Sequence, residues 1–134
     1  MAANLKRTIG FFIGIFVGFL YTDWLFHTQH VHAFEMTATT TVERLSALAF
    51  GGAGTILFFI ICRKVFSLSF FHGVLAASGF FASFDIVVFH WLFRLHRLTY
   101  GPEADIIEPI LVVIGIILLV YAVRKEKNLT FQPE

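Results

Sequence analysis

Residues 106–123 read IIEPILVVIGIILLVYAV, and Glu108 is the one charged side chain in this segment. A helix needs about 20 mostly apolar residues to cross the hydrocarbon core of a bilayer, so the segment is long enough to span a membrane. Comparable segments precede it, and we predict transmembrane helices over roughly 8–26, 42–62, 67–95 and 103–123. Of the 134 residues, 57% are apolar, more than a soluble domain of this size buries. The sequence therefore predicts an all-α, polytopic membrane protein: a four-transmembrane-helix bundle that forms a single domain over residues 1–134.

The basic residues predict how this bundle is oriented. Seven of the ten Lys and Arg residues flank one end of the predicted helices: Lys6, Arg7, Arg63, Lys64, Arg124, Lys125 and Lys127. Because basic loops stay in the cytoplasm, we predict an N-in/C-in protein of a bacterial inner (plasma) membrane with both termini cytoplasmic. No small-x-small cleavage pattern closes the first apolar segment, so we expect this segment to be retained. A net charge of +1 with dispersed basic residues gives no reason to expect nucleic acid as a partner.

Small residues predict how the helices pack. Gly10, Gly14 and Gly18 recur at every fourth position of the first helix, a spacing that lets another helix approach closely inside lipid. A similar surface is expected on the second helix from Gly51, Gly52 and Gly54. Besides the lipid bilayer, the partners expected at such faces are another membrane protein or a second copy of the chain.

A polar stripe is predicted at the end of the first helix. Asp23, His27 and His30 are four and three positions apart, so on a continuous helix they share one face. Imidazole nitrogens and a carboxylate oxygen at this spacing can bind zinc or copper, with His32 or a residue of another helix as a further ligand. The alternative is a solvated histidine cluster at the membrane surface.

The third predicted helix carries a carboxylate inside its apolar segment. Asp85 lies about 10 Å below the expected membrane surface, where a charged group needs a partner. His96 returns to the same face of a regular helix, whereas His90 points about 140° away and is expected to meet a different neighbour. We expect Asp85 to be buried near histidines of the first and third helices, with Asp23 close by. Its role is either metal ligation, proton relay or a structural hydrogen bond.

Three other polar residues receive structural interpretations. Glu108, near the start of the fourth helix, is the remaining acid within reach of the polar residues around Asp85, but the macrodipole alone explains it. His72 follows two phenylalanines at the start of the third helix and is expected to pack at the interface. Cys62 is the single cysteine, which excludes an intrachain disulfide and a cysteine-based metal site. No serine-nucleophile motif, phosphate-binding loop or HExxH pattern is present, so the sequence carries no catalytic signature and favours a non-enzymatic role without deciding the question.

The second half of the chain carries a specific motif, D-x4-H-x-L-x-R-L-H-x3-Y. Its residues are Asp85, His90, Leu92, Arg94, Leu95, His96 and Tyr100. This pattern resembles the bacterial membrane-protein family named domain of unknown function 2243, which the first half of the chain matches more loosely. The resemblance implies that Asp85, His90 and His96 belong to one motif and supports the four-helix topology. It names no reaction, because the family has no established activity.

Two functions from different classes follow from these patterns. The first is an extracytoplasmic site that binds copper or zinc for storage, sensing or delivery. Its candidate ligands are Asp23, His27, His30, His32, Asp85, His90 and His96. The alternative is a non-catalytic accessory or structural subunit of a larger membrane complex, packed through its glycine faces. A haem held by histidines of the first and third helices ranks below both, because no motif supports it.

Overall fold

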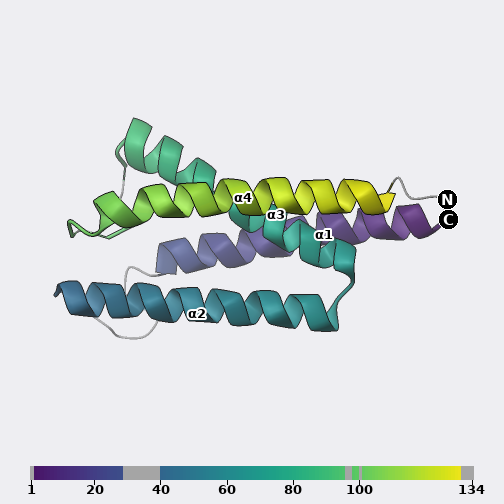
Figure 1. The fold of residues 1–134 in the computed structure, drawn as a ribbon, viewed down its shortest axis with the longest axis horizontal. Helices are drawn as coiled ribbons and strands as arrows, with labels where there is room; N and C mark the ends of the chain where they lie inside the picture. Colours follow the sequence, from purple (N-terminus) through teal and green to yellow (C-terminus); the bar gives the residue numbers. More distant parts are fainter. Residues whose placement is uncertain (1, 29–39, 96–97, 100, 131–134) are drawn as a thin grey trace.

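The computed structural model describes residues 2–28, 40–95, 98–99 and 101–130, and Figure 1 shows their arrangement. The described part of the chain forms four long helices: α1 (Ala2–Thr28), α2 (Thr41–Val65), α3 (Leu68–Phe84) and α4 (Ala104–Thr130). A π-helix, η1 (Asp85–Leu92), continues α3 without a break. The predicted all-α architecture with four helices is confirmed.

All four helical stretches can cross a membrane. Ala3–Leu25, Thr41–Val65, Leu68–Leu92 and Ala104–Leu129 are each long and apolar enough to do so. Large apolar side chains stand on the outside of the bundle, among them Phe16 at 64% and Ile117 at 60% exposure. Such a surface is unfavourable in water but matches the hydrocarbon of a bilayer. The chain is therefore a multi-pass membrane protein whose outer faces contact lipid.

The two ends of the bundle carry different groups. The start of α1, the end of α4 and the α2–α3 turn lie at one end, which we call the terminal end (Figure 1). The opposite end holds η1 and the start of α4, and we call it the His90 end. Helices α1 and α4 extend past their predicted apolar ranges at the terminal end, because polar residues continue the same helices beyond the span.

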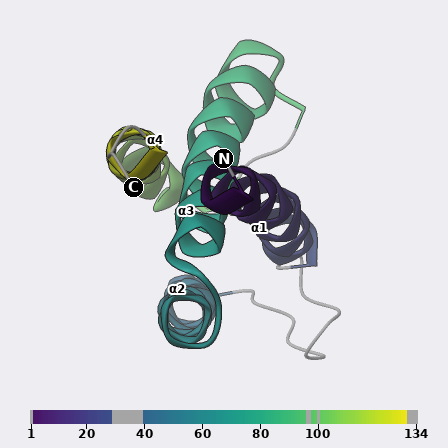
Figure 2. The same cartoon turned by 90° about the vertical axis from the view of Figure 1, so that its right-hand side faces the viewer.

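Helix α3 lies at the centre of the bundle and packs closely on α1 (Figure 2). A Cβ atom built on Gly14 would lie 2.1 Å from the carbonyl oxygen of Phe70, and one on Gly18 would lie 2.7 Å from that of Val74. Neither position has room for a side chain, because backbone stands directly opposite. The predicted packing of the first helix through its glycines is confirmed at these two contacts.

The other face of α3 packs on α4 through a pair of facing glycines. A Cβ atom on Gly79 would lie 2.4 Å from the oxygen of Gly115, and one on Gly115 would lie 2.7 Å from the oxygen of Gly79. The two backbones therefore touch at mid-bundle. Close backbone contact of this kind is the usual way that helices associate in lipid, where no hydrophobic effect drives them together.

Helix α2 lies at the edge of the bundle. It begins with a capping box of Thr40 and Glu43, and Cys62 near its other end packs on Phe70 and Val74 of α3. Two of the three glycines expected to form a packing surface are not used for contacts within the described chain, because a Cβ atom built on Gly52 or Gly54 meets no atom within 4 Å outside its own helix backbone. Its neighbours are instead α3 at the terminal end and Tyr21 of α1.

A buried contact between a histidine and a carboxylate joins α3 to α4 at the terminal end. Nδ1 of His72 lies 2.8 Å from Oε2 of Glu126, and both side chains are less than one-tenth exposed. The sequence predicts only packing at the interface for His72, and the structure adds a buried partner on α4. This partner could not be predicted from α3 alone, because the pairing depends on how α3 and α4 pack against each other.

Candidate functional site

The π-helix brings Asp85 and His90 onto one face. In this helix type each backbone N–H bonds to the carbonyl five residues earlier, so positions five apart lie one above the other. The N–H of Phe93 bonds in this way to the carbonyl of Val88 at 2.9 Å. The expectation that His90 points about 140° away from Asp85 assumed a regular α-helix, and it is wrong for this reason.

His90 lies between two carboxylates in the interior. Its Nε2 lies 3.0 Å from Oδ2 of Asp85, and its Nδ1 lies 3.0 Å from Oε1 of Glu108 on α4. The three residues are 5%, 4% and 0% exposed in the order Asp85, His90 and Glu108. Ionisable groups are costly inside a membrane protein and persist there when they face one another. We refer to these three residues as the His90 cluster.

Glu108 organises this cluster. Its Oε2 accepts a hydrogen bond from Trp91 Nε1 at 2.8 Å, and its Oε1 accepts one from the backbone N–H of Leu98 at 2.9 Å. Both of these groups are obligate donors, and two fixed donors on one carboxylate favour its ionised, acceptor-only form. Nδ1 of His90 shares Oε1 with Leu98, so this nitrogen is assigned the proton and donates to Glu108.

This assignment determines what can lie between His90 and Asp85. An imidazole that is protonated at Nδ1 presents a lone pair at Nε2 unless a second proton is bound there. A lone pair and a carboxylate oxygen repel each other at 3.0 Å, so a cation has to lie between them. That cation is either a proton, shared by Nε2 and Oδ2, or a metal ion.

The spacing fits two ligands of one metal ion. Bonds of about 2.0–2.1 Å from zinc to nitrogen and to a carboxylate oxygen place two tetrahedral ligands roughly 3.3 Å apart. The observed 3.0 Å differs by a few tenths of an ångström, which a small side-chain rotation supplies. Glu108 then has the position of the outer carboxylate that usually binds the second nitrogen of a metal-ligating histidine.

Two ligands alone do not complete a metal site. Across residues 2–28, 40–95, 98–99 and 101–130, the structure brings together no group of three or more His, Cys, Asp and Glu side chains that could hold a metal ion. Glu108 does not count as a ligand in this arrangement, because it faces the other nitrogen of the His90 ring. Any further ligand would have to come from elsewhere in the chain.

The other predicted ligands are placed as follows. Asp23 is exposed on α1, and η1 leans away from the end of α1 in both views (Figures 1 and 2). His27 is in the last turn of α1, where only the backbone is described. His30, His32 and His96 lie outside the described residues. The structure therefore brings Asp85 and His90 together and leaves the remaining candidates as predictions.

A pocket at the surface leads to His90. It has a volume of about 590 Å³ and is lined by His90, Trp91, Arg94, Asp105 and Pro109. The chain turns back at its rim through Arg94, whose φ of 52° is in the left-handed region. This conformation costs a side-chain-bearing residue roughly 1–2 kcal/mol, and it returns the chain towards Leu98 and Glu108. The pocket provides a path between the outside of the bundle and the His90 ring.

The segment before α4 is fastened to α2 by an ion pair. The Arg44 guanidinium binds the Glu103 carboxylate, which also accepts a hydrogen bond from the hydroxyl of Thr99 at 2.8 Å. Arg44 holds the pKa of Glu103 at about 2, well below its ordinary value. Leu98 is bound to Glu108 in the same short segment, so residues 98–103 connect the His90 cluster to the start of α2.

Sequence reasoning missed the part played by Glu108. Its position near a helix start suggested a macrodipole effect, but that effect fades within the first turn and α4 begins at Ala104. A carboxylate past the first turn and followed by an apolar run is a signal for a buried partner. Trp91 was also missed, since its donor role becomes visible only when α4 is placed beside η1.

Comparison of the chain with protein-family models, curated protein sequences and solved structures returned no match. The resemblance of the second-half motif to domain of unknown function 2243 therefore remains a prediction from the motif.

Proposed function

We propose that this membrane protein binds a transition-metal ion, copper or zinc, at the His90 cluster for storage, sensing or delivery. The observation that carries the proposal is the 3.0 Å separation of Asp85 Oδ2 and His90 Nε2, with the other ring nitrogen already held by Glu108. Copper and zinc are the metals that imidazole and carboxylate ligands suit. Binding a divalent ion would displace the proton shared by these two atoms, since a ligand has to be deprotonated to coordinate.

The orientation proposed for the chain puts this site outside the cytoplasm. The basic residues gather at the terminal end, and basic segments remain on the cytoplasmic side of a bacterial inner membrane. The His90 end then faces the extracytoplasmic space. The pocket beside His90 opens at this end, which would admit an ion from outside without its crossing the hydrocarbon.

The coordination sphere would be completed by histidines. Two more ligands give the tetrahedral number, and His27, His30, His32 and His96 are the candidates that the sequence provides. Asp85 and His90 would be the fixed part of the site, because both are buried on η1. Asp23 remains a candidate only if the end of α1 approaches η1 when metal binds.

Element analysis of protein purified gently in detergent tests the proposal. We expect close to one equivalent of copper or zinc in the wild type and a loss of that metal in His90→Ala. His72→Ala is the matched control, because it removes another buried histidine that pairs with a carboxylate of α4. Retention of metal in His72→Ala together with its loss in His90→Ala supports the site. Wild-type protein that neither contains metal nor takes it up would refute it.

A second candidate function is an accessory subunit of a larger membrane complex. It is favoured by α2, where Gly51 and Cys62 are the buried residues and the backbone at Gly54 is open to close approach by another helix. Copurification from cross-linked membranes tests it. A partner that is lost in Gly54→Leu supports this candidate, and an unchanged set of copurifying proteins contradicts it.

A further inference from the structure

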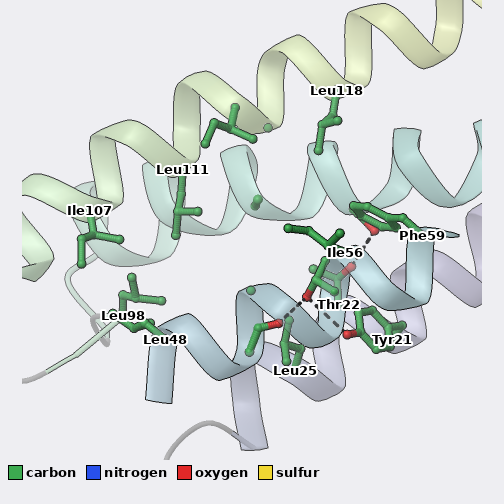
Figure 3. Close-up of a pocket in the computed structure, with 17 residues that line it drawn as sticks. Tyr21, Thr22, Leu25, Leu48, Ile56, Phe59, Leu98, Ile107, Leu111 and Leu118 are labelled. Atoms are coloured by element: carbon green, nitrogen blue, oxygen red, sulfur yellow. Dashed lines mark hydrogen bonds between the residues drawn. The ribbon is translucent and has the colours of Figure 1, made fainter. Parts of the chain in front are cut away.

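We infer that the cavity between the four helices binds one hydrocarbon chain of a membrane lipid, taken from the leaflet at the His90 end. The cavity has a volume of about 350 Å³ and is drawn in Figure 3. All four helices contribute to its walls, and it is separate from the pocket that leads to His90. This inference does not depend on metal binding.

The path of α3 creates the cavity. This helix fills the centre of the bundle at the terminal end, and then continues into η1, which leans out past α4 (Figures 1 and 2). Ser78 and Ala82 are therefore the last residues of α3 that line the cavity. Beyond them α1, α2 and α4 surround a space that no central helix occupies. Figure 3 shows Ile107, Leu111 and Leu118 pointing into this space from α4.

The lining of the cavity does not favour a polar ligand. Most of its side chains are aliphatic, and its hydroxyl groups bond to one another or to backbone. Thr55 donates to the carbonyl of Gly51 at 2.8 Å, and Tyr21 lies 3.2 Å from the same hydroxyl. Thr22 lies 2.7 Å from the carbonyl of Gly18 and 2.9 Å from the hydroxyl of Ser78. Because these groups already have partners, the occupant is apolar.

The size of the cavity matches a chain of one leaflet. Its volume is more than twice the roughly 150 Å³ of an apolar cavity that accepts benzene. Along α4 it extends from Ile107 to Leu118, which is about 16 Å at 1.5 Å per residue. Half of a hydrocarbon core of about 30 Å is close to this length. A helix of a second copy would need the full thickness, so it fits the cavity less well than a lipid chain.

The cavity is continuous with the surface that already contacts lipid. Ile56 of α2 and Ile114 of α4 both line it, and they are 62% and 45% exposed on the outside of the bundle. In the described part of the chain, α2 and α4 do not pack extensively on each other. A lipid chain can therefore enter sideways between these two helices.

Photo-crosslinking with a defined lipid tests the inference. The purified protein is reconstituted in phosphatidylcholine vesicles that contain phosphatidylcholine with a diazirine on one acyl chain, either near the ester or near the terminal methyl. We expect the first probe to label the level of Leu98 and Ile107, and the second to label the level of Phe59 and Leu118. Labels confined to outward-facing residues such as Phe16 and Ile117 would overturn the inference, and so would crosslinks between two protein chains at the cavity.

A matched pair of variants makes the result specific. Gly52 lines the cavity and Gly54 does not, and among the described residues a Cβ atom built on either glycine meets no neighbouring atom within 4 Å. Gly52→Phe should fill the cavity and reduce the cavity labels at least several-fold, whereas Gly54→Phe should leave them unchanged. Equal labelling in the two variants would contradict the inference. Equal melting temperatures of the two variants in detergent would show that both remain folded. The positions labelled by the two probes in the wild type test the inference without any substitution.

Discussion

Nδ1 of His90 lies 3.0 Å from Oε1 of Glu108, so a histidine of η1 is held by a carboxylate that is fully buried in α4. This contact sets the orientation of the imidazole ring and therefore directs Nε2 at Asp85. It also connects the ring to the backbone of Leu98, which donates to the same oxygen. The geometry of the candidate site thus depends on a residue that would not itself bind the metal.

Replacing this carboxylate by an amide should weaken the fold. In Glu108→Gln the side-chain NH2 cannot accept a hydrogen bond, so at least one of the three donors around it loses its acceptor. An unsatisfied buried group costs about 1–3 kcal/mol, and we expect the melting temperature in detergent to fall accordingly. Lys127→Gln, which removes an exposed charge at the other end of α4, is the control and should melt like the wild type. Equal melting of all three proteins would contradict the role assigned to Glu108.

Gly14→Leu should separate α1 from α3. The new Cβ atom would lie 2.1 Å from a backbone oxygen of Phe70, which cannot rotate away. Overpacking typically costs about 1–3 kcal/mol, and a clash with backbone should reach at least the upper part of that range. Thermal unfolding in detergent measures the effect. Gly54→Leu adds the same side chain at a position where the described part of the chain has no neighbouring atom within 4 Å, so a similar loss in both variants would count against the contact.

The stabilisation from the Arg44–Glu103 ion pair should decrease at acidic pH. Arg44 lowers the pKa of Glu103 from 4.5 to about 2 in the folded protein. When folding lowers the pKa of a carboxyl group, that group stabilises the fold fully at pH values above its unfolded pKa. The stabilisation is lost as the pH falls towards its folded pKa. The melting temperature of the wild type should exceed that of Glu103→Gln at about pH 6, and the difference should shrink towards about pH 2.5. A difference that stays constant over this range would exclude the ion pair as its source.

The orientation is tested by labelling of single cysteines in a Cys62→Ala background. A membrane-impermeant maleimide applied to intact cells should modify a cysteine at position 39 in Thr39→Cys, because the connection between α1 and α2 is expected outside. Asn128→Cys at the terminal end should react only after the cells are permeabilised. The opposite pattern would reverse the topology that the basic residues predict.

The sequence predicted the helices but not the register of η1. Hydropathy identifies spans because a lipid-facing helix needs only apolar residues over a sufficient length, whichever way it packs. Gly14 and Gly18 predicted close helix packing for a similarly local reason, because their spacing lies within one helix. By contrast, Glu108 of α4 contacts both His90 and Trp91 of the π-helix, and no local pattern in the sequence reports that relationship.

Only part of the candidate site was predicted, because contacts between helices leave no local pattern in the sequence. Asp85 was recognised by the cost of a carboxylate inside an apolar segment, and the structure places it in the interior. His90 was assigned to another neighbour because a regular helix was assumed. Glu126 and His72 form a second buried pair that could be found only once α3 and α4 lay side by side. Pairings between helices depend on crossing geometry, which the sequence of one helix does not contain.

The most direct test of the central claim is a zinc titration of the purified, metal-free protein and three variants in detergent. We expect one equivalent to bind in the wild type and in Glu126→Gln, which removes the α4 carboxylate that pairs with His72 outside the site. Glu108→Gln should bind about 10–100-fold more weakly, as expected when the outer partner of a metal-ligating histidine is lost. Asp85→Asn should lose more affinity than Glu108→Gln, because it removes a ligand. Zinc affinity that is the same in Asp85→Asn as in Glu126→Gln would contradict the claim that Asp85 and His90 hold a metal ion between them.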